Sequence, residues 1–448
     1  MADNNYIRRK IDTDLLSWMR SGKRKPLLLR GARQVGKSSA VRNLGKQFEY
    51  FLEVNFERDQ YARKLFAEGD LSPQRLCRGL ASKYEIPIIP GKTLLFLDEI
   101  QASLPAISSL RFFYEDYEDL HVAAAGSLME FALRELPSLG VGRITPMYVY
   151  PMCFSEFLSA CGRHILLEDI QNADCGKPLP GSAHNTAVEL LKIFIIIGGM
   201  PEVVSAYTSG NDLLACQRIL DSLVDTLRAD FAKYKEKAPT TRISTVFDSV
   251  AVQMGKKFVY TNVSGDYSNR QSKEALELLK MAGIVIPVIH TAANGIPLGA
   301  EIDIKRQKMF LLDTGVYQRV LKLPLSDLLI SDDFALVNKG NIAELFAGLE
   351  ILKSYSCYGR NDLYYWHRES KNSNAEVDFL VQNGWDIIPV EVKSNTKGSM
   401  RSMRLFMEEK KSSLGIRTSL ENFGEIPGIK IVPLYAVGDF VAGHDRKN

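Results

Sequence analysis

Cysteine is scarce in this sequence and shows no metal-binding or redox spacing. Only six cysteines occur in 448 residues, and none of them forms a C-x-x-C pair. This pattern gives no support for a zinc site or a disulfide framework, and it favours reduced thiols in the cytosol. We therefore predict a cytoplasmic protein.

Long hydrophobic runs are also missing. The longest apolar stretch, near Ile193–Ile197, is far too short to cross a bilayer. Residues 1–5 are polar and lack the apolar core of a secretory signal. These absences predict a soluble protein that has no membrane partner.

A large excess of charge of one sign is absent as well. The formal net charge of +3 over 448 residues does not by itself indicate binding to nucleic acid, although it does not exclude local basic clusters. The content of 46% hydrophobic and 24% charged residues is ordinary for a globular protein. Because the chain is longer than one hydrophobic core usually serves, we expect two or three domains.

The first 150 residues alternate short apolar segments with segments of helical spacing. This alternation is typical of a parallel β-sheet that is covered by helices. The expected strands are residues 26–29, 51–55, 93–97, 121–124 and 147–150. The clearest expected helices are residues 38–46 and 104–117. We therefore predict an α/β domain over residues 1–155.

Residues 31–38 read G-x-x-x-x-G-K-S and follow the first expected strand directly. In this motif the backbone N–H groups curl around the β-phosphate, Lys37 reaches the β- and γ-phosphate oxygens, and the Ser38 hydroxyl ligates Mg²⁺. A helix that begins at Ser38 points its positive N-terminus at the same charge. The alternative is a plain glycine turn between a strand and a helix. The pattern predicts ATP binding by Gly31, Ala32, Arg33, Gln34, Val35, Gly36, Lys37, Ser38 and Ser39.

Two acids end the apolar segment of residues 94–97. In a P-loop enzyme such a strand lies beside the phosphate loop, where Asp98 would complete the Mg²⁺ shell and Glu99 would polarise the attacking water. The alternative is a buried strand whose acids merely meet solvent at its end. The position of the acids about 60 residues after the glycine motif favours the functional interpretation.

Further candidates for contacts to the nucleotide follow the next expected strand. Ser127 could donate a hydrogen bond to the γ-phosphate or the water, as a sensor residue does, or could simply cap a helix. Arg143 and Arg134 could supply positive charge to the transferring phosphoryl group, although a solvated arginine is the commoner situation. All three are therefore candidates that have a structural alternative.

Helical patterns replace strand signals in the middle of the chain. Residues 156–235 are predicted to form a helical lid, and Thr186 with Glu189 has the form of a capping box that starts a helix. Residues 236–305 show two helical patterns followed by a hairpin, the order of a winged helix-turn-helix. A small packing module without DNA contact is an equally good interpretation of this segment.

The last third, residues 306–448, has a helix–strand–strand–strand order that indicates another α/β domain. Glu391 and Lys393 share one face of an expected strand, and Asp378 lies on the neighbouring strand. Together with Glu344 in the preceding helix, Asp378 and Glu391 could hold a divalent metal, with Lys393 activating a water. The alternative is alternating surface charge on an antiparallel sheet.

These motifs together resemble the bacterial and archaeal AAA-type "ATP-binding protein" family with a C-terminal DUF4143 domain. The resemblance covers residues 6 to about 410. Its markers are residues 30–38, 96–101, 126–127, 142–143, 151–157, 198–202, 312–315 and 340–344, and the two strands that carry Asp378, Glu391 and Lys393.

The resemblance implies ATP binding and hydrolysis by the N-terminal domain, a winged-helix linker, and a C-terminal α/β fold similar to that of PD-(D/E)xK restriction-endonuclease-like proteins. Glu344, Asp378, Glu391 and Lys393 fall on the nuclease pattern one by one. The stretch at residues 151–153 departs from the family by replacing the leucine and serine that are usual beside this proline. DNA cleavage does not follow from the resemblance, because many nuclease-like folds only bind.

Three functional hypotheses remain. The first is an ATPase, dependent on Mg²⁺, that drives a nuclease-like, DNA-directed C-terminal domain. The second is an ATP-dependent regulatory switch or interaction module with an inactive nuclease-like domain and a protein partner or a second copy of the chain. The third, a nucleotide kinase, is weaker, because Glu99 suits the activation of water and no acceptor site is visible.

Overall fold

The computed structural model describes residues 6–136, 142–234, 237–323, 341–370, 373–393 and 400–445. The chain divides into two compact units. The N-terminal unit comprises Met1–Pro151 together with Met281–Gly283 and Cys357–Arg360, and the C-terminal unit comprises the remaining residues.

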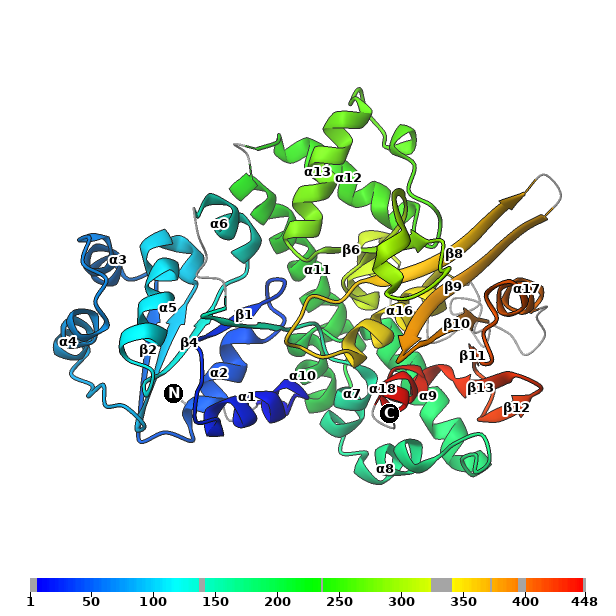
Figure 1. The fold of residues 1–448 in the computed structure, drawn as a ribbon, viewed down its shortest axis with the longest axis horizontal. Coiled ribbons are helices and arrows are strands. Elements are labelled where there is room, and N and C mark those ends of the chain that lie inside the picture. Colours follow the sequence, from blue (N-terminus) through cyan, green and yellow to red (C-terminus); the bar gives the residue numbers. More distant parts are fainter. Residues whose placement is uncertain are drawn as a thin grey trace. The chain divides into compact units, whose positions relative to one another are not determined.

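The N-terminal unit is built on a five-stranded sheet (Figure 1). Its strands are β1 (Leu27–Arg30), β2 (Tyr50–Asn55), β3 (Thr93–Asp98), β4 (His121–Ala125) and β5 (Thr145–Tyr148). Their order is β2-β3-β4-β1-β5, and each neighbouring pair is parallel. The strand that carries Asp98 is therefore separated from β1 by β4.

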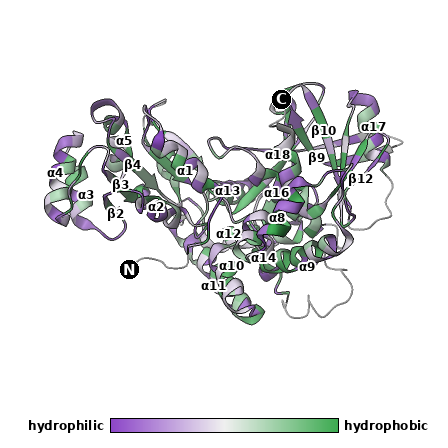
Figure 2. Ribbon diagram, turned by 90° about the horizontal axis from the view of Figure 1, so that it is seen from below, coloured by the Kyte–Doolittle hydropathy of each residue, from purple (hydrophilic) through white to green (hydrophobic). Residues whose placement is uncertain are grey.

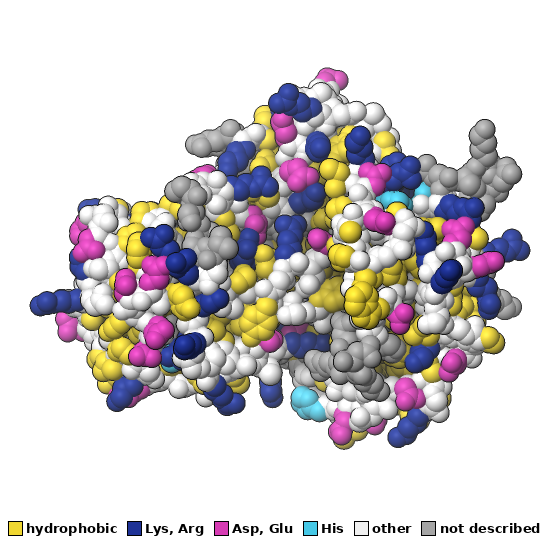
Figure 3. Space-filling model, in the orientation of Figure 1, with side chains coloured by type: hydrophobic (Ala, Val, Ile, Leu, Met, Phe, Trp, Pro, Cys, Tyr) yellow, Lys and Arg dark blue, Asp and Glu magenta, His cyan; other side chains and the backbone are white. Residues whose placement is uncertain are grey.

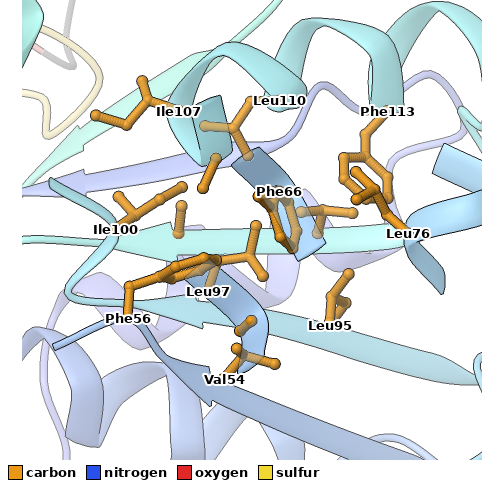
Figure 4. Close-up of a cluster of buried hydrophobic side chains, with 14 of the residues drawn as sticks. Val54, Phe56, Phe66, Leu76, Leu95, Leu97, Ile100, Ile107, Leu110 and Phe113 are labelled. Atoms are coloured by element: carbon orange, nitrogen blue, oxygen red, sulfur yellow. The ribbon is translucent and has the colours of Figure 1, made fainter. Parts of the chain in front are cut away.

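Helices cover both faces of this sheet. They are α1 (Ile11–Arg20), α2 (Lys37–Gly45), α3 (Gln60–Ala67), α4 (Pro73–Tyr84), α5 (Leu104–Asp116) and α6 (Met129–Glu135). On one face, Phe66 of α3, Leu76 of α4 and Phe113 of α5 pack with Leu95 and Leu97 of β3 (Figure 4). On the other face, the alternation along β3 turns Phe96 toward Phe51, which lies beneath α2. The central strands are consequently buried on both sides, as their unbroken apolar sequence predicts.

Helices make up the first half of the C-terminal unit and flank its sheet. They are α7 (Phe154–Ala160), α8 (His164–Asn172), α9 (Gly181–Ile197), α10 (Pro201–Gly210), α11 (Leu213–Asp230), α12 (Thr240–Val252), α13 (Asn269–Met281), α14 (Thr314–Val320), α16 (Asn341–Ser354), α17 (Arg401–Lys410) and α18 (Val437–Asp445). Hydropathy along the ribbon alternates between hydrophilic and hydrophobic in many of these helices (Figure 2). Within the described residues, no helix combines the length and the apolar character that crossing a membrane requires.

The C-terminal unit also contains an eight-stranded mixed sheet in the order β12-β13-β11-β10-β9-β8-β6-β7. The strands are β6 (Val285–Thr291), β7 (Ile302–Leu311), β8 (Leu363–Ser370), β9 (Ser373–Asn383), β10 (Asp386–Val392), β11 (Gly415–Ser419), β12 (Gly424–Ile426) and β13 (Ile429–Pro433). β6 runs parallel to β8, and β10 and β13 run parallel to β11, whereas the other pairs are antiparallel. The prediction of an α/β chain with a parallel-sheet domain and a second sheet domain is therefore confirmed.

Helices α16 and α17 cover opposite faces of this second sheet. Phe406 of α17 packs in a cluster with Trp366 and Val377. On the other face, a Cβ atom at Gly348 of α16 would lie 2.7 Å from Phe310 and 2.8 Å from Phe379, so only glycine allows this close approach. The face that α16 covers is the one on which a buried cluster of charges is found, as described below.

Buried carboxylates tie the helices of the C-terminal unit to its loops. Asp313 accepts hydrogen bonds from the backbone N–H groups of Gly199 (2.6 Å) and Val316 (3.1 Å), and burial raises the pKa of its carboxyl. Glu350 of α16 accepts a hydrogen bond from the N–H of Phe154 at 3.0 Å. Three of the sequence markers, residues 151–157, 198–202 and 312–315, thus contribute structural contacts.

The domain limits expected from the sequence differ from the observed organisation. The predicted limit after residue 305 falls inside β7, and the β6–β7 hairpin belongs to the same sheet as β8–β13. The chain passes from the first compact unit to the second between residues 151 and 152, whereas the sequence placed a limit after residue 155. Because β6 pairs with β8, the segment predicted as a winged helix shares a sheet with the C-terminal third.

The helix predicted to start at Thr186 starts earlier. Helix α9 begins at Gly181, directly after Pro180, and the Thr186 hydroxyl donates a hydrogen bond to the carbonyl of Ser182 at 3.0 Å. This i to i−4 bond is available to a threonine inside a helix, so the hydroxyl does not cap the helix start.

Candidate functional site

The glycine loop, residues 31–38, connects β1 to α2. Gly31, Gln34 and Gly36 adopt φ angles of 142°, 63° and 95°, values that favour glycine or a small set of polar residues. A Cβ atom at Gly31 would lie 2.1 Å from the carbonyl oxygen of Val149. The loop therefore needs the glycine at position 31 for both its backbone angle and its packing.

The Lys37 ammonium lies over the glycine loop itself. Its Nζ atom donates hydrogen bonds to the carbonyl oxygens of Gly31 at 2.9 Å and Ala32 at 2.7 Å. Burial lowers the pKa of Lys37 to about 8, while the negative charges of Glu99 and Asp98 oppose this shift. The loop thus holds a positive charge at the N-terminus of α2, where an anion is favoured.

Ser38 and Asp98 meet although 60 residues separate them in the sequence. The Ser38 hydroxyl donates a hydrogen bond to Oδ1 of Asp98 at 2.9 Å, and Nδ2 of Asn55 donates one to Oδ2 at 3.2 Å. The contact forms across β4 because α2 packs against both β3 and β4. Burial raises the pKa of Asp98. A hydroxyl and a carboxylate are hard oxygen donors, so these residues fit Mg²⁺.

Glu99 follows Asp98 in a left-handed backbone conformation, with φ 47° and ψ 41°. Its carboxylate accepts a hydrogen bond from Nε2 of Gln101 at 2.6 Å. Gln101 also packs against the residue after β4, because a Cβ atom at Gly126 would lie 2.2 Å from Oε1 of Gln101. Sequence reasoning gave no role to Gln101, although residue 101 ends one of the sequence markers.

The other nucleotide-binding candidates lie in two different places. Ser127 is buried, two residues beyond the end of β4. Arg143 precedes the N-terminal end of β5, and its Nε atom forms an ion pair with Glu115 near the end of α5. In a parallel sheet this edge is opposite to the one where β1 enters the glycine loop. The structure therefore does not bring Arg143 to the loop, because the N-terminal ends of the strands face away from it.

A second cluster of charges lies in the C-terminal unit and centres on Lys308 of β7. Its Nζ atom forms ion pairs with Glu344 of α16 at 2.7 Å and with Glu376 of β9 at 2.6 Å, and only 1% of its side chain is exposed. The ammonium also lies 5.1 Å from the centre of the Tyr365 ring. Burial opposes this charge, but Glu344, Asp378 and Glu376 together hold the pKa of Lys308 above its ordinary value.

Asp378 lies at a bulge of β9. Tyr364 and Trp366 of β8 pair with Leu380 and Val377 of β9, so two β9 residues stand opposite the single residue Tyr365. Such a bulge changes the direction of a side chain. The Asp378 carboxylate accepts a hydrogen bond from the N–H of Val392 at 2.8 Å, and burial raises its pKa. Its strongest electrostatic attraction is to Lys308, and the attraction to Lys393 is weaker.

Glu391 and Lys393 pair with each other at the end of β10. Their side chains form an ion pair, as the shared strand face predicted. Burial raises the pKa of Glu391, while Lys393 opposes the shift. Oε2 of Glu391 is buried and has no hydrogen-bond partner within the described part of the chain. This oxygen is the one feature of the predicted metal set that would suit a cation.

The predicted metal ligands Glu344, Asp378 and Glu391 do not form one open donor set. Among the residues that the structure describes, no group of three or more His, Cys, Asp or Glu side chains is arranged to hold a metal ion. Instead the Lys308 ammonium pairs with Glu344, and the Val392 N–H donates a hydrogen bond to Oδ2 of Asp378. The residues present therefore do not fit a divalent metal, and sequence reasoning missed Lys308 and Glu376. Lys308 follows the polar run of residues 305–307, which suggests an exposed strand.

The sequence matches three domain families. An AAA domain covers residues 23–158, a domain of unknown function (DUF8612) covers residues 188–327, and a domain of unknown function (DUF4143) covers residues 339–437. None of the curated proteins matches the chain.

Solved structures show distant likeness. The Walker-type ATPase PABY2304 of Pyrococcus abyssi is 17% identical, with a TM-score of 0.45, and the match covers 71% of this chain and 97% of that protein. The Orc1 protein of Aeropyrum pernix in complex with DNA is 13% identical, with a TM-score of 0.29 and coverage of 75% and 97%. Together, the AAA match at residues 23–158 and the DUF4143 match at residues 339–437 confirm the resemblance of this chain to AAA-type proteins with a C-terminal DUF4143 domain.

Proposed function

We propose that the N-terminal unit binds ATP with Mg²⁺ and hydrolyses it. The observation that carries this proposal is the hydrogen bond between Ser38 and Asp98, which joins the end of the glycine loop to the first acid after β3. Ser38 and Asp98 would hold the metal, and Lys37 would contact the β- and γ-phosphates. Bound Mg²⁺ neutralises charge that develops on the phosphate oxygens during transfer.

In this proposal Glu99 is the residue that acts on water. A carboxylate can orient the attacking water and accept its proton, provided that it lies within hydrogen-bond reach. Gln101 holds one oxygen of Glu99 at 2.6 Å, which leaves the other oxygen available to water. Gln101 is thus a positioning residue, because it acts through Glu99.

The test uses two substitutions and measures two quantities. Lys37→Ala should abolish ATP binding in a fluorescent-nucleotide titration, whereas Glu99→Gln should retain binding and lose turnover by about 10²–10⁴-fold. Lys46→Ala, at the exposed residue just after α2, and Glu118→Gln, at an exposed position before β4, are matched controls that should behave as the unchanged protein. If ATP turnover survives both Lys37→Ala and Glu99→Gln, the assignment of this site is wrong.

We further propose that ATP hydrolysis serves the C-terminal domain, whose partner is DNA or a protein. On the face drawn in Figure 3, Lys and Arg side chains are interspersed with Asp and Glu. This distribution agrees with the net charge of +3 and does not by itself favour DNA. The rate of ATP hydrolysis with and without double-stranded DNA separates the two partners. Stimulation supports DNA, and an unchanged rate supports a protein.

A further inference from the structure

The Lys308 cluster brings together charges from three elements of the C-terminal unit and an aromatic ring from a fourth. Lys308 comes from β7, Glu344 from α16, Glu376 and Asp378 from β9, and the Tyr365 ring from β8. Both ion-pair distances lie below 3 Å, and the lysine side chain is almost completely buried. A lysine in this environment is fixed by its partners, since an unpaired buried ammonium would be very costly.

An ammonium and a divalent cation compete for the same carboxylate oxygens. Lys308 has three N–H donors; it donates a hydrogen bond to Oε1 of Glu344 and forms an ion pair with Oε1 of Glu376. A metal at this position would have to displace a positive charge that is already within 2.7 Å of these acids. The negative charge that would attract a metal is therefore already neutralised.

We propose that the Lys308 ammonium takes the place of a divalent metal in the Glu344–Glu376–Asp378 cluster. The C-terminal domain is then a metal-independent module that binds a partner and does not hydrolyse phosphodiesters. The proposal is independent of ATP hydrolysis, because every residue in it belongs to the C-terminal unit.

The pair of Glu391 and Lys393 does not restore a metal site. Oε2 of Glu391 is buried and has no hydrogen-bond partner among the described residues, but Asp378, whose charge acts on Glu391, accepts the N–H of Val392 and interacts most strongly with Lys308. A single carboxylate next to a lysine offers too few oxygen ligands for Mg²⁺ or Mn²⁺ without substrate phosphates. Lys308 thus neutralises the charge of Glu344 and its neighbours on β9, and Lys393 separately neutralises the charge of Glu391.

The experiment measures the effect of Mn²⁺ on the thermal unfolding of the full-length, nucleotide-free protein. All samples carry Asp98→Asn, so that the N-terminal acid cannot contribute a metal effect. With Lys308 intact, we expect Mn²⁺ to leave the Tm unchanged. With Lys308→Met, we expect a lower Tm in EDTA and a rise of about 5–10 °C at a Mn²⁺ concentration on the order of 100 times the Kd, since the carboxylates are now open.

A second buried lysine of the same unit is the matched control. Lys353 forms an ion pair with Glu350 at 3.3 Å, and both side chains are 7% exposed, but Glu350 also accepts the N–H of Phe154. Lys353→Met should lower the Tm without any Mn²⁺-dependent rise. A rise of equal size in the Lys353→Met protein would overturn the proposal, because the Mn²⁺ effect would then not depend on Lys308.

A binding measurement on protein with Lys308 intact covers the case in which Lys308→Met does not fold. Titration calorimetry with Mn²⁺ on the Asp98→Asn protein should give no saturable binding, and plasmid DNA should remain unnicked in Mg²⁺ or Mn²⁺. Saturable Mn²⁺ binding that Glu344→Gln removes would sink the proposal. Nicking that is lost with Asp378→Ala or Lys393→Ala would do the same.

Discussion

The two groups of carboxylates described above are held in opposite ways. In the N-terminal unit, neutral side chains hold the acids: Ser38 and Asn55 contact Asp98, and Gln101 contacts Glu99. In the C-terminal unit, the ammonium of a buried lysine holds two acids by direct ion pairs. An acid with neutral partners keeps its negative charge available to a cation, whereas an acid with an ammonium partner does not.

The two groups of acids also differ in what the neighbouring lysine, Lys37 or Lys308, contacts. Lys37 donates to the carbonyl oxygens of the glycine loop and influences Asp98 and Glu99 only through space. Lys308 donates to carboxylates directly. A lysine near acidic residues therefore has a different effect in the two units. Where the lysine donates to backbone carbonyl oxygens, the carboxylates can still bind a cation; where it pairs with the carboxylates, they cannot.

The largest difference should appear when Asp98 and Glu344 are each made neutral. Asp98→Asn should reduce ATP turnover by about 10²–10³-fold and should not lower the Tm, because it removes a buried charge whose direct partners are neutral. Glu344→Gln should leave ATP turnover unchanged and lower the Tm, because Lys308 loses one of its counter-ions. ATP turnover assays and calorimetry on both variants test this expectation. An equal loss of Tm in the two variants would contradict the difference between the two groups of acids.

The charge balance of the C-terminal cluster can be tested by a double substitution. Lys308→Met should lower the free energy of unfolding by about 3–5 kcal/mol, since it leaves the buried Glu344 carboxylate without its cation. Adding Glu344→Gln to Lys308→Met should recover part of this loss, because the removed positive and negative charges then match. Urea unfolding of the two single variants and the double variant gives the interaction energy. Simple additivity of the two losses would show that Lys308 does not compensate Glu344.

Lys37 should make ATP binding depend on pH. Its pKa of about 8 in the free protein lies below the ordinary value, because burial disfavours the charged form. Above that pH the ammonium is lost, so at pH 9 about one molecule in ten retains it, and ATP affinity should fall by up to about 10-fold between pH 7 and pH 9. Lys37→Arg keeps its charge over this range and should flatten the profile. An unchanged affinity for ATP from pH 7 to pH 9 in the native protein would be evidence against this role.

Local sequence patterns were enough to predict the elements of the N-terminal unit. The apolar segments 26–29 and 93–97 became β1 and β3, because a strand buried on both faces has an unbroken apolar sequence. The order of the strands could not be predicted in this way. The insertion of β4 between β1 and β3, and the pairing of β6 with β8, depend on contacts between residues far apart in the chain.

The same distinction applies to the site residues. Ser38 and Asp98 were predictable because their motifs fix both residue type and spacing, and the structure brings them to 2.9 Å. Lys308 was not predictable, because the first half of β7 is largely exposed and the burial of Lys308 is decided by α16 and β9. The assignment of Arg143 to ATP was a guess from charge alone, and its ion pair with Glu115 lies at the other edge of the sheet.

Gln101 offers a smaller test of how the N-terminal acids are held. Gln101→Ala should lower kcat by about 10-fold and leave the KM for ATP nearly unchanged, because Glu99 loses its orientation while the phosphate contacts remain. Gln74→Ala is a matched control, since Gln74 of α4 donates to the carbonyl of Asp116 at an exposed position. A rise in KM with unchanged kcat would mean that Gln101 contributes to nucleotide binding instead.

Substitution of Arg143 should have the smallest effect on ATP turnover and stability. This result would show that the N-terminal site lies at only one edge of its sheet. Its side chain is 44% exposed and pairs with Glu115, so Arg143→Ala should change the free energy of unfolding by no more than about 0.5 kcal/mol. ATP turnover should stay within about twofold, because the guanidinium lies at the edge opposite to the glycine loop. Steady-state kinetics at several protein concentrations provide the measurement. A fall in kcat at every concentration would contradict this placement, whereas a fall only at high concentration would show that Arg143 acts on the ATP site of a second copy.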